Sequence, residues 1–249
     1  MTGIPRIRLD VGGERDQPLM IVINTMKRWL DGEPVWPYAK ILDEWGQDFE
    51  MYRKRLFHPK FATRYILDRT LSMHITRDAW IKKYGFFIPC AELLAELKKQ
   101  KHIIEVGAGS GYMTRLMRQH GIDVVGTDYD WRGPSQYGFT IGEYDSQQIN
   151  GAPGKTMVRR YRDSTVFCSW PSLGRTWFRQ MLKAMRIGQR IIAIREDACA
   201  EDSAWHYLDD CFRFDDTIDI PAFTHLNDIA VVYTKKKQNG EQHEQHAED

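Results

Sequence analysis

The hydrophobic positions of the chain follow two periods, and their alternation predicts an α/β protein. From residue 84 to 234, short apolar runs typical of buried strands alternate with segments whose apolar residues recur every three or four positions, as in amphipathic helices. The expected strands are 102–106, 122–126, 165–168, 190–194, 213–220 and 229–234. The expected helices are 90–99, 112–120, 177–185 and 204–211. Because helices separate most strands, we expect a doubly wound, mostly parallel Rossmann-like sheet. No helix separates the last two strands, so they are expected to form an antiparallel pair.

The two ends of the chain do not show this alternation of strand-like and helix-like segments. A short β-like run at residues 7–11 is followed by helical periodicity that is clearest at 43–57. We therefore expect a mainly helical N-terminal region at 1–83, a candidate lid or substrate cap, ahead of a cofactor-binding domain at 84–234. Residues 235–249 are polar with almost nothing to bury, which predicts a disordered tail.

Composition excludes some classes of protein. The 249 residues are 42% hydrophobic and 28% charged, which is ordinary for a globular protein and excludes a wholly disordered chain. The four cysteines are widely spaced and form no CxxC pair, so we expect free thiols and no metal site. The chain has no apolar run of about 18–20 residues and no signal-peptide core at its start, so we expect a cytoplasmic location.

A glycine-rich loop carries the clearest chemical signal. Glu105–Tyr112 reads EVGAGSGY and lies between an expected strand and an expected helix. Its glycines follow a GxGxG pattern, which lacks the GxGxxG spacing of the dinucleotide fingerprint. Asp128 ends the next expected strand, where its carboxylate can accept hydrogen bonds from two ribose hydroxyls, and Glu105 can attract a cationic group. A tight turn of purely structural importance is the alternative. The order of strand, glycines, helix, strand and acid favours an adenosine with a cationic amino-acid end, as in S-adenosylmethionine.

These residues resemble motifs I and II of the class I S-adenosylmethionine-dependent methyltransferases. The resemblance is greatest to a little-characterised branch with a YGF-like segment, a GAGxGYW loop and a CWPP-like strand end, here Tyr84–Pro89, Glu105–Tyr112 and Phe167–Ser172. It covers residues 77–234 and departs from the branch at Ser172, where the second proline would stand. The resemblance implies S-adenosylmethionine as cofactor, held by Glu105, Gly107, Ala108, Gly109, Gly111, Tyr112, Asp128 and Tyr129, with Tyr84 and Pro89 bordering its pocket.

The resemblance also implies a third strand that ends in an acid for the adenine. The candidates are Thr156–Val158 for the strand and Asp163 for the acid, but the spacing to the next strand is short. Adenine recognition therefore stays open.

Methyl transfer is an in-line displacement in which much of the catalysis comes from positioning the acceptor. Residues 169–172, called the transfer loop below, stand where amino-methylating enzymes carry an (N/D)PPY motif, but no Asn or Asp comes first. Methylation of planar amines on DNA is therefore weakly supported. The candidate catalytic residues are Ser169 and Trp170. Trp170 is equally well explained as a pocket wall that contacts the sulfonium or as packing under the loop. His58 and His74 are less favoured bases from a lid.

The charges are unevenly distributed along the chain. The total is close to neutral, with 35 basic and 34 acidic residues. Residues 53–83 hold nine basic and two acidic residues, 155–195 hold ten and one, and 196–228 hold one and ten. The two basic blocks suit a nucleic acid or another anionic partner. Solvation, or pairing with the acidic block, is the favoured interpretation.

We therefore expect a methyltransferase acting on an unidentified acceptor. The alternative is a non-catalytic methyltransferase-like module that binds the cofactor or a macromolecular partner. A nucleotide-dependent oxidoreductase is disfavoured by the GxGxG spacing.

Overall fold

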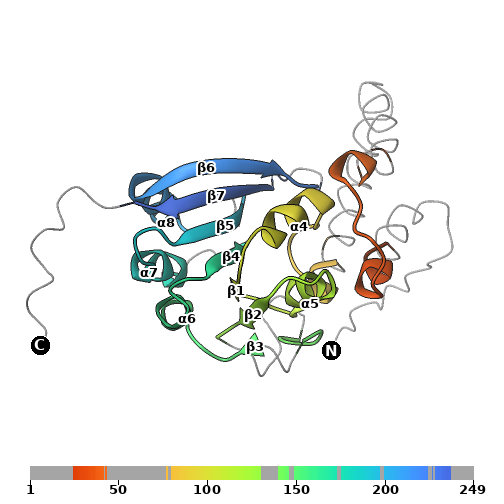
Figure 1. The fold of residues 1–249 in the computed structure, drawn as a ribbon, viewed down its shortest axis with the longest axis horizontal. Helices are drawn as coiled ribbons and strands as arrows, with labels where there is room; N and C mark the ends of the chain where they lie inside the picture. Colours follow the sequence, from red (N-terminus) through yellow and green to blue (C-terminus); the bar gives the residue numbers. More distant parts are fainter. Residues whose placement is uncertain are drawn as a thin grey trace, which may run out of the picture.

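A single mixed sheet organises the protein. The computed structural model describes residues 25–41, 43, 77, 80–129, 140–145, 149–172, 175–196, 199–223, 226 and 228–236. Seven strands pair in the order β3-β2-β1-β4-β5-β7-β6 (Figure 1). They are β1 (Ile103–Val106), β2 (Val124–Thr127), β3 (Ile149–Asn150), β4 (Thr165–Ser169), β5 (Arg190–Arg195), β6 (Phe212–Asp219) and β7 (Ile229–Lys235).

The strand directions confirm the expected fold class. β1 to β5 pair in parallel, whereas β7 runs antiparallel to both β5 and β6. Parallel strands need crossover connections, and here helices provide most of them. The carboxyl ends of β1, β2 and β4 consequently meet at one edge of the sheet, which is where ligands bind in such folds.

Helices cover both faces of the sheet (Figure 1). They are α4 (Ala91–Lys98), α5 (Tyr112–Gln119), α6 (Gly154–Arg160), α7 (Trp177–Ala184) and α8 (Asp202–Cys211). Side chains of α4 and α5 share one core cluster with Ile192 and Ile194 of β5, while α6, α7 and α8 share another with Ile191 and Ala193. The split follows from the two-residue period of a strand, because successive side chains point to opposite faces.

The expected strand at 156–158 is wrong. These residues lie in α6, and the third strand is the two-residue β3, which pairs with β2 through Gly126 and Ile149. Met157 and Val158 are buried, as a strand would also require. Two adjacent apolar residues do not distinguish a helix from a strand, so the period was misread.

The N-terminal segment at 25–41 packs onto the α/β domain. Met26, Trp29 and Ile41 are buried in the same core cluster as α4 and α5. The backbone N–H of Ala91 donates to the Trp36 carbonyl at 2.9 Å. The predictions for residues 7–11, for most of 43–57, for His58 and His74, and for the tail beyond 236 lie outside the described residues.

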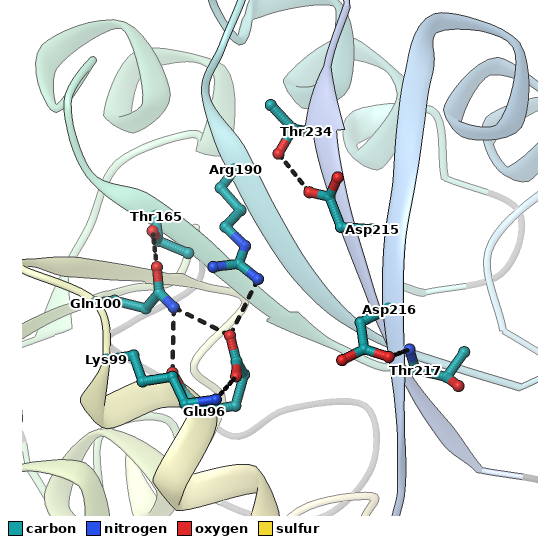
Figure 2. A network of polar contacts seen from close by, with 9 residues as sticks. All are labelled: Glu96, Lys99, Gln100, Thr165, Arg190, Asp215, Asp216, Thr217 and Thr234. Atoms are coloured by element: carbon teal, nitrogen blue, oxygen red, sulfur yellow. Dashed lines mark hydrogen bonds and ion pairs between the residues drawn. The ribbon is translucent and has the colours of Figure 1, made fainter.

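A polar network fastens the edge of the sheet opposite the glycine loop (Figure 2). Glu96 at the end of α4 forms ion pairs with Arg190 at 3.0 Å and with Lys99 at 2.7 Å. Thr165 donates to Gln100 at 2.9 Å. These contacts join α4 to the starts of β4 and β5.

No helix in the described part of the chain is both long and apolar enough to cross a membrane.

Candidate cofactor and acceptor site

The glycine loop has a backbone that only glycine adopts easily. Gly107, Gly109 and Gly111 have φ angles of +78°, +54° and +78°, in the left-handed region where a Cβ is unfavourable. A Cβ on Gly107 would stand 3.5 Å from Cη2 of Trp177, an ordinary contact, so the backbone angle and not the space requires glycine. The loop leaves β1 and enters α5 at Tyr112, as the sequence predicts.

Three successive N–H groups of this loop are already used inside the protein. Gly107 and Ala108 donate to the Thr127 carbonyl at 2.9 and 3.0 Å. Gly109 donates to Oδ2 of Asp128 at 2.9 Å. A pyrophosphate would need such groups as free donors. The loop therefore suits a ligand without phosphates, one held by carboxylates and by close approach to the backbone.

Asp128 lies where the prediction places it. It follows β2 directly, is half-buried, and is joined to the glycine loop through Gly109. Tyr129, the next residue, has a side chain that is 73% exposed. The carboxylate and the ring consequently stand at the ligand-binding edge of the sheet, beside the loop.

Glu105 is a buried acid and is not exposed to solvent. It lies in β1, is 2% exposed, and accepts a hydrogen bond from the Thr114 hydroxyl of α5. Burial raises the pKa of Glu105 to about 8; the Thr114 hydrogen bond opposes this rise and the nearby Asp128 adds to it. A cationic ligand group beside these acids would favour the charged form of Glu105.

Three further residues of the predicted cofactor site are buried; they are Tyr84, Pro89 and Tyr112. The rings of Tyr84 and Tyr112 pack edge to face, with centroids 5.2 Å apart. The hydroxyl of Ser110 donates to the Tyr84 carbonyl at 3.1 Å, so the segment before α4 supports the loop through its backbone. Their contact with a cofactor stays a prediction.

The transfer loop brings Trp170 beside an acid far away in the sequence. Ser169 ends β4, and Trp170 follows it with a φ of +48°, which is unusual for a residue other than glycine. The indole N–H donates to Oδ1 of Asp228 at 2.8 Å. The Phe86 ring stacks on the indole at 5.5 Å, and the Arg77 guanidinium lies 4.9 Å from its centroid.

The sequence analysis missed Asp228, Glu196 and Arg77 as site residues, whereas Phe86 lies in the Tyr84–Pro89 segment that the resemblance implies beside the pocket. Asp228 precedes β7 and Glu196 follows β5, and the pairing of Arg195 with Ile229 brings the two acids to one edge. Both are 6% exposed. The sequence showed them only as members of an acidic block, because strand order is needed to place them next to Trp170.

A buried thiol lies between the two halves of the site. Cys168 of β4 is fully buried, and burial raises its pKa well above the usual range; Cys199, Glu105 and Asp128 add to the rise. The thiol is consequently neutral. Its electrostatic neighbours show that the glycine-loop acids and the transfer loop share this edge of the sheet.

Asp163, the candidate acid for the adenine, does not reach this edge of the sheet. It precedes β4 and therefore lies at the opposite edge, where it forms an ion pair with Arg186 on the surface. After β3 the chain continues as Gly151, Ala152 and Pro153, so no acid directly follows the third strand.

The site residues fit S-adenosylmethionine. Two carboxyl groups flank a loop whose positive-φ glycines leave room for a ligand, and the N–H groups that would hold a pyrophosphate are occupied. These hydrogen-bond acceptors suit ribose hydroxyls and a cationic amino-acid end.

Comparisons with known proteins agree with this interpretation. A family model described as Protein-L-isoaspartate(D-aspartate) O-methyltransferase (PCMT) matches residues 49–129, less than half of the chain but including the glycine loop and Asp128. No curated protein matches the chain significantly.

Solved structures resemble the chain only distantly. Magnesium protoporphyrin IX methyltransferase from Synechocystis PCC 6803 aligns with a TM-score of 0.43 and 14% identity, over 66% of this chain and 97% of that one. N-methyltransferase NodS from Bradyrhizobium japonicum WM9 aligns with a TM-score of 0.38 and 11% identity, over 58% and 93%. A methyltransferase from Archaeoglobus fulgidus aligns with a TM-score of 0.37 and 11% identity, over 70% and 100%.

Likenesses this distant are not an argument by themselves, so the assignment rests on the loop and the sheet. The family model covers the residues that form the glycine loop, and the sheet has the expected parallel order with an antiparallel end. The glycine loop, Asp128 and the strand order therefore resemble those of the class I S-adenosylmethionine-dependent methyltransferases.

Proposed function

We propose that the protein transfers a methyl group from S-adenosylmethionine to an acceptor bound between the glycine loop and the transfer loop. The observation that carries the proposal is the use of the loop amides. Gly107 and Ala108 donate to Thr127, and Gly109 donates to Asp128. This arrangement leaves carboxylates rather than amide donors to meet the ligand, which favours S-adenosylmethionine over a dinucleotide.

The chain's own residues have separable tasks in this proposal. Asp128 binds the ribose hydroxyls. Glu105 loses its proton when a cationic ligand end lies beside it, and its negative charge then stabilises that end. When bound, the cofactor supplies an electrophilic methyl group on a sulfonium. Ser169 and Trp170 border the acceptor side, because they follow β4, the neighbour of β1 in the sheet. Positioning of this kind supplies much of the rate in a displacement reaction.

Binding calorimetry with S-adenosylmethionine, S-adenosylhomocysteine and NAD tests the proposal. We expect both adenosyl ligands to bind and NAD not to bind. Asp128→Ala is expected to weaken adenosyl binding by about 1–3 kcal/mol, the cost of lost hydrogen bonds to a buried ligand. Asp123→Ala is the matched control, since Asp123 is exposed and precedes β2 at the opposite edge. Absence of adenosyl binding at millimolar ligand would overturn the proposal.

A positive face favours a second candidate, in which a polyanion such as a nucleic acid is the partner. In the block 155–195, Arg186, Arg190 and Arg195 pair with Asp163, Glu96 and Asp209. Within the described part of the chain, the other basic side chains of this block are exposed and form no ion pair; they are Lys155, Arg159, Arg160, Arg162, Arg175, Arg179 and Lys183. Most of them lie on α6 and α7, which pack together. RNA and DNA binding measured against salt concentration tests this candidate, and absence of binding at low salt excludes it.

A further inference from the structure

We propose that Asp228 is the catalytic carboxylate that binds a nitrogen acceptor through its N–H group and removes its proton. This inference rests on the proposed function and names the acceptor class for the same site. The acceptor would be an amine or a similar N–H nucleophile rather than a carboxylate.

Asp228 is held in position by one of its two oxygens. Oδ1 accepts the indole N–H of Trp170 at 2.8 Å. Trp170 is itself constrained by the stacked Phe86 ring and by its backbone contact, since its N–H reaches the Ile194 carbonyl at 3.4 Å. The indole thereby serves as a positioning group for the acid. The positive φ of Trp170 is consistent with this role, because unusual backbone angles persist where the surrounding contacts enforce them.

The second oxygen of Asp228 has no partner. Oδ2 is buried and accepts no hydrogen bond from any residue that the structure describes, although the residue is only 6% exposed. Leaving a buried acceptor unsatisfied costs about 1–3 kcal/mol, and more when the group is charged. An N–H donor from a ligand would remove this cost. The unpartnered oxygen is thus the observation that points to a ligand here.

The charges around Asp228 favour one kind of acceptor. The groups that act on it are Glu196 after β5, Cys199 before α8, and Arg77, while Trp170 donates to it. Burial raises the pKa of Asp228 to about 7; the Trp170 hydrogen bond and Arg77 oppose the rise, and Glu196 adds to it. When Asp228 is ionised, the two carboxyl groups outnumber the single guanidinium of Arg77, so the local charge disfavours a carboxylate acceptor and stabilises a nitrogen that becomes positively charged.

The position of Asp228 connects it to the reaction. β7 begins after Asp228 and pairs with β5, β5 pairs with β4, and β4 pairs with β1, which carries the glycine loop. The nitrogen lone pair forms the bond to the methyl carbon while the electron pair of the carbon–sulfur bond stays on sulfur. The proton of the resulting ammonium then passes to Oδ2 of Asp228. A pKa near the operating pH suits a group that takes up and releases this proton.

Sinefungin tests the inference without knowledge of the acceptor, because it carries an amine in place of the methyl sulfonium. We expect the wild-type protein to bind sinefungin more tightly than S-adenosylhomocysteine, with the ratio rising as the pH increases through about 7 and Asp228 loses its proton. Asp228→Asn should reduce the ratio by about 10–100-fold, the value of a hydrogen bond to a charged group. Its affinity for S-adenosylhomocysteine should not change.

Two further variants make the test specific. Trp170→Phe removes the indole donor and keeps a ring, so it should shift the pH midpoint of the ratio upward, because the lost hydrogen bond had lowered the pKa of Asp228. Asp210→Asn, an exposed acid on α8, is the matched control and should change neither quantity. If S-adenosylhomocysteine binds but Asp228→Asn leaves the ratio unchanged, the inference is wrong and the proposed function stands. If neither ligand binds the wild-type protein, the proposed function fails.

Discussion

Two acids in the site, Glu105 and Asp228, stay uncharged up to near-neutral pH for the same reason, burial at the ligand-binding edge of the sheet. Each is at least nine-tenths buried, and burial raises the pKa to about 8 for Glu105 and about 7 for Asp228. Each group has one hydrogen-bond donor beside it, Thr114 or Trp170, that partly opposes the rise. Buried groups with perturbed pKa values of this kind cluster at functional sites.

Glu105 should make the stability of the ligand-free protein depend on pH. Its pKa is higher in the folded state, about 8, than in the unfolded chain, about 4.5. The folded state therefore holds a proton that the unfolded chain releases, and stability is lost as the pH rises from about 4.5 to about 8. For a shift of this size the loss is on the order of 5 kcal/mol.

Glu105→Gln should remove this part of the pH dependence, since an amide resembles the protonated acid. We expect urea unfolding of the variant to match the wild type at pH 5 and to show the greater stability at pH 8. Asp123→Asn, at an exposed position, should unfold like the wild type at both pH values. Equal losses in the wild type and in Glu105→Gln would show that Glu105 is charged when folded.

At the scale of elements, α6 begins so close to β1 that its first residue has no room for a side chain. A Cβ on Gly154 would stand 2.7 Å from Cγ1 of Val106 and 3.5 Å from Met181. Nearby, the Thr127 hydroxyl at the end of β2 donates to the Ala152 carbonyl at 2.9 Å. The loop from β3 into α6 is therefore fixed against the strand that carries the glycine loop.

Gly154→Ala is expected to destabilise the protein by about 1–3 kcal/mol, because overpacking forces neighbours to move. Urea unfolding of Gly154→Ala, Val106→Ala and the double variant measures the coupling. The double variant should be less destabilised than the sum of the two single changes, since the smaller residue at 106 relieves the clash. Additive losses would indicate that the contact with Val106 does not limit the position of α6.

At the scale of the whole molecule, the N-terminal segment and the α/β domain share a core. Met26, Trp29 and Ile41 lie in one cluster with α4 and α5, and Trp29 is 1% exposed. The Tyr38 N–H donates to the Glu92 carboxylate of α4 at 2.9 Å. The segment at 25–41 is consequently a fixed part of the helical layer. A lid or substrate cap, if the N-terminal region forms one, has to be sought in its remaining residues.

Trp29→Ala should therefore destabilise the whole chain, by about 3–5 kcal/mol for a buried aromatic residue. We expect circular dichroism and fluorescence to report one coincident unfolding transition at a lower urea concentration. Ile187→Ala, a change at a residue that is 54% exposed, should have an effect within about 0.5 kcal/mol. A separate early transition in Trp29→Ala would instead make the N-terminal segment an independent unit.

Local patterns predicted the elements that are long enough to show a period. The helix at Tyr112–Gln119 and the strands at Ile103–Val106 and Arg190–Arg195 were expected within a residue or two of their bounds. β3 was missed because two residues carry no period, and the neighbouring helix α6 was taken for the strand instead. The candidate acid near that segment, Asp163, consequently lies away from the glycine loop, and adenine recognition stays open.

The sequence by itself determined the class of the fold and the glycine-loop half of the site. Glu105–Tyr112 and Asp128 belong to one strand–turn–helix–strand unit, so local patterns suffice to place them. Only the tertiary structure brings together the residues of the proposed acceptor half. Trp170 and Asp228 are 58 residues apart and meet because β7 pairs with β5 and β5 with β4. Burial likewise turned Glu105 from an open carboxylate into a largely protonated acid, since desolvation depends on everything packed around a group and not on its neighbours in the chain.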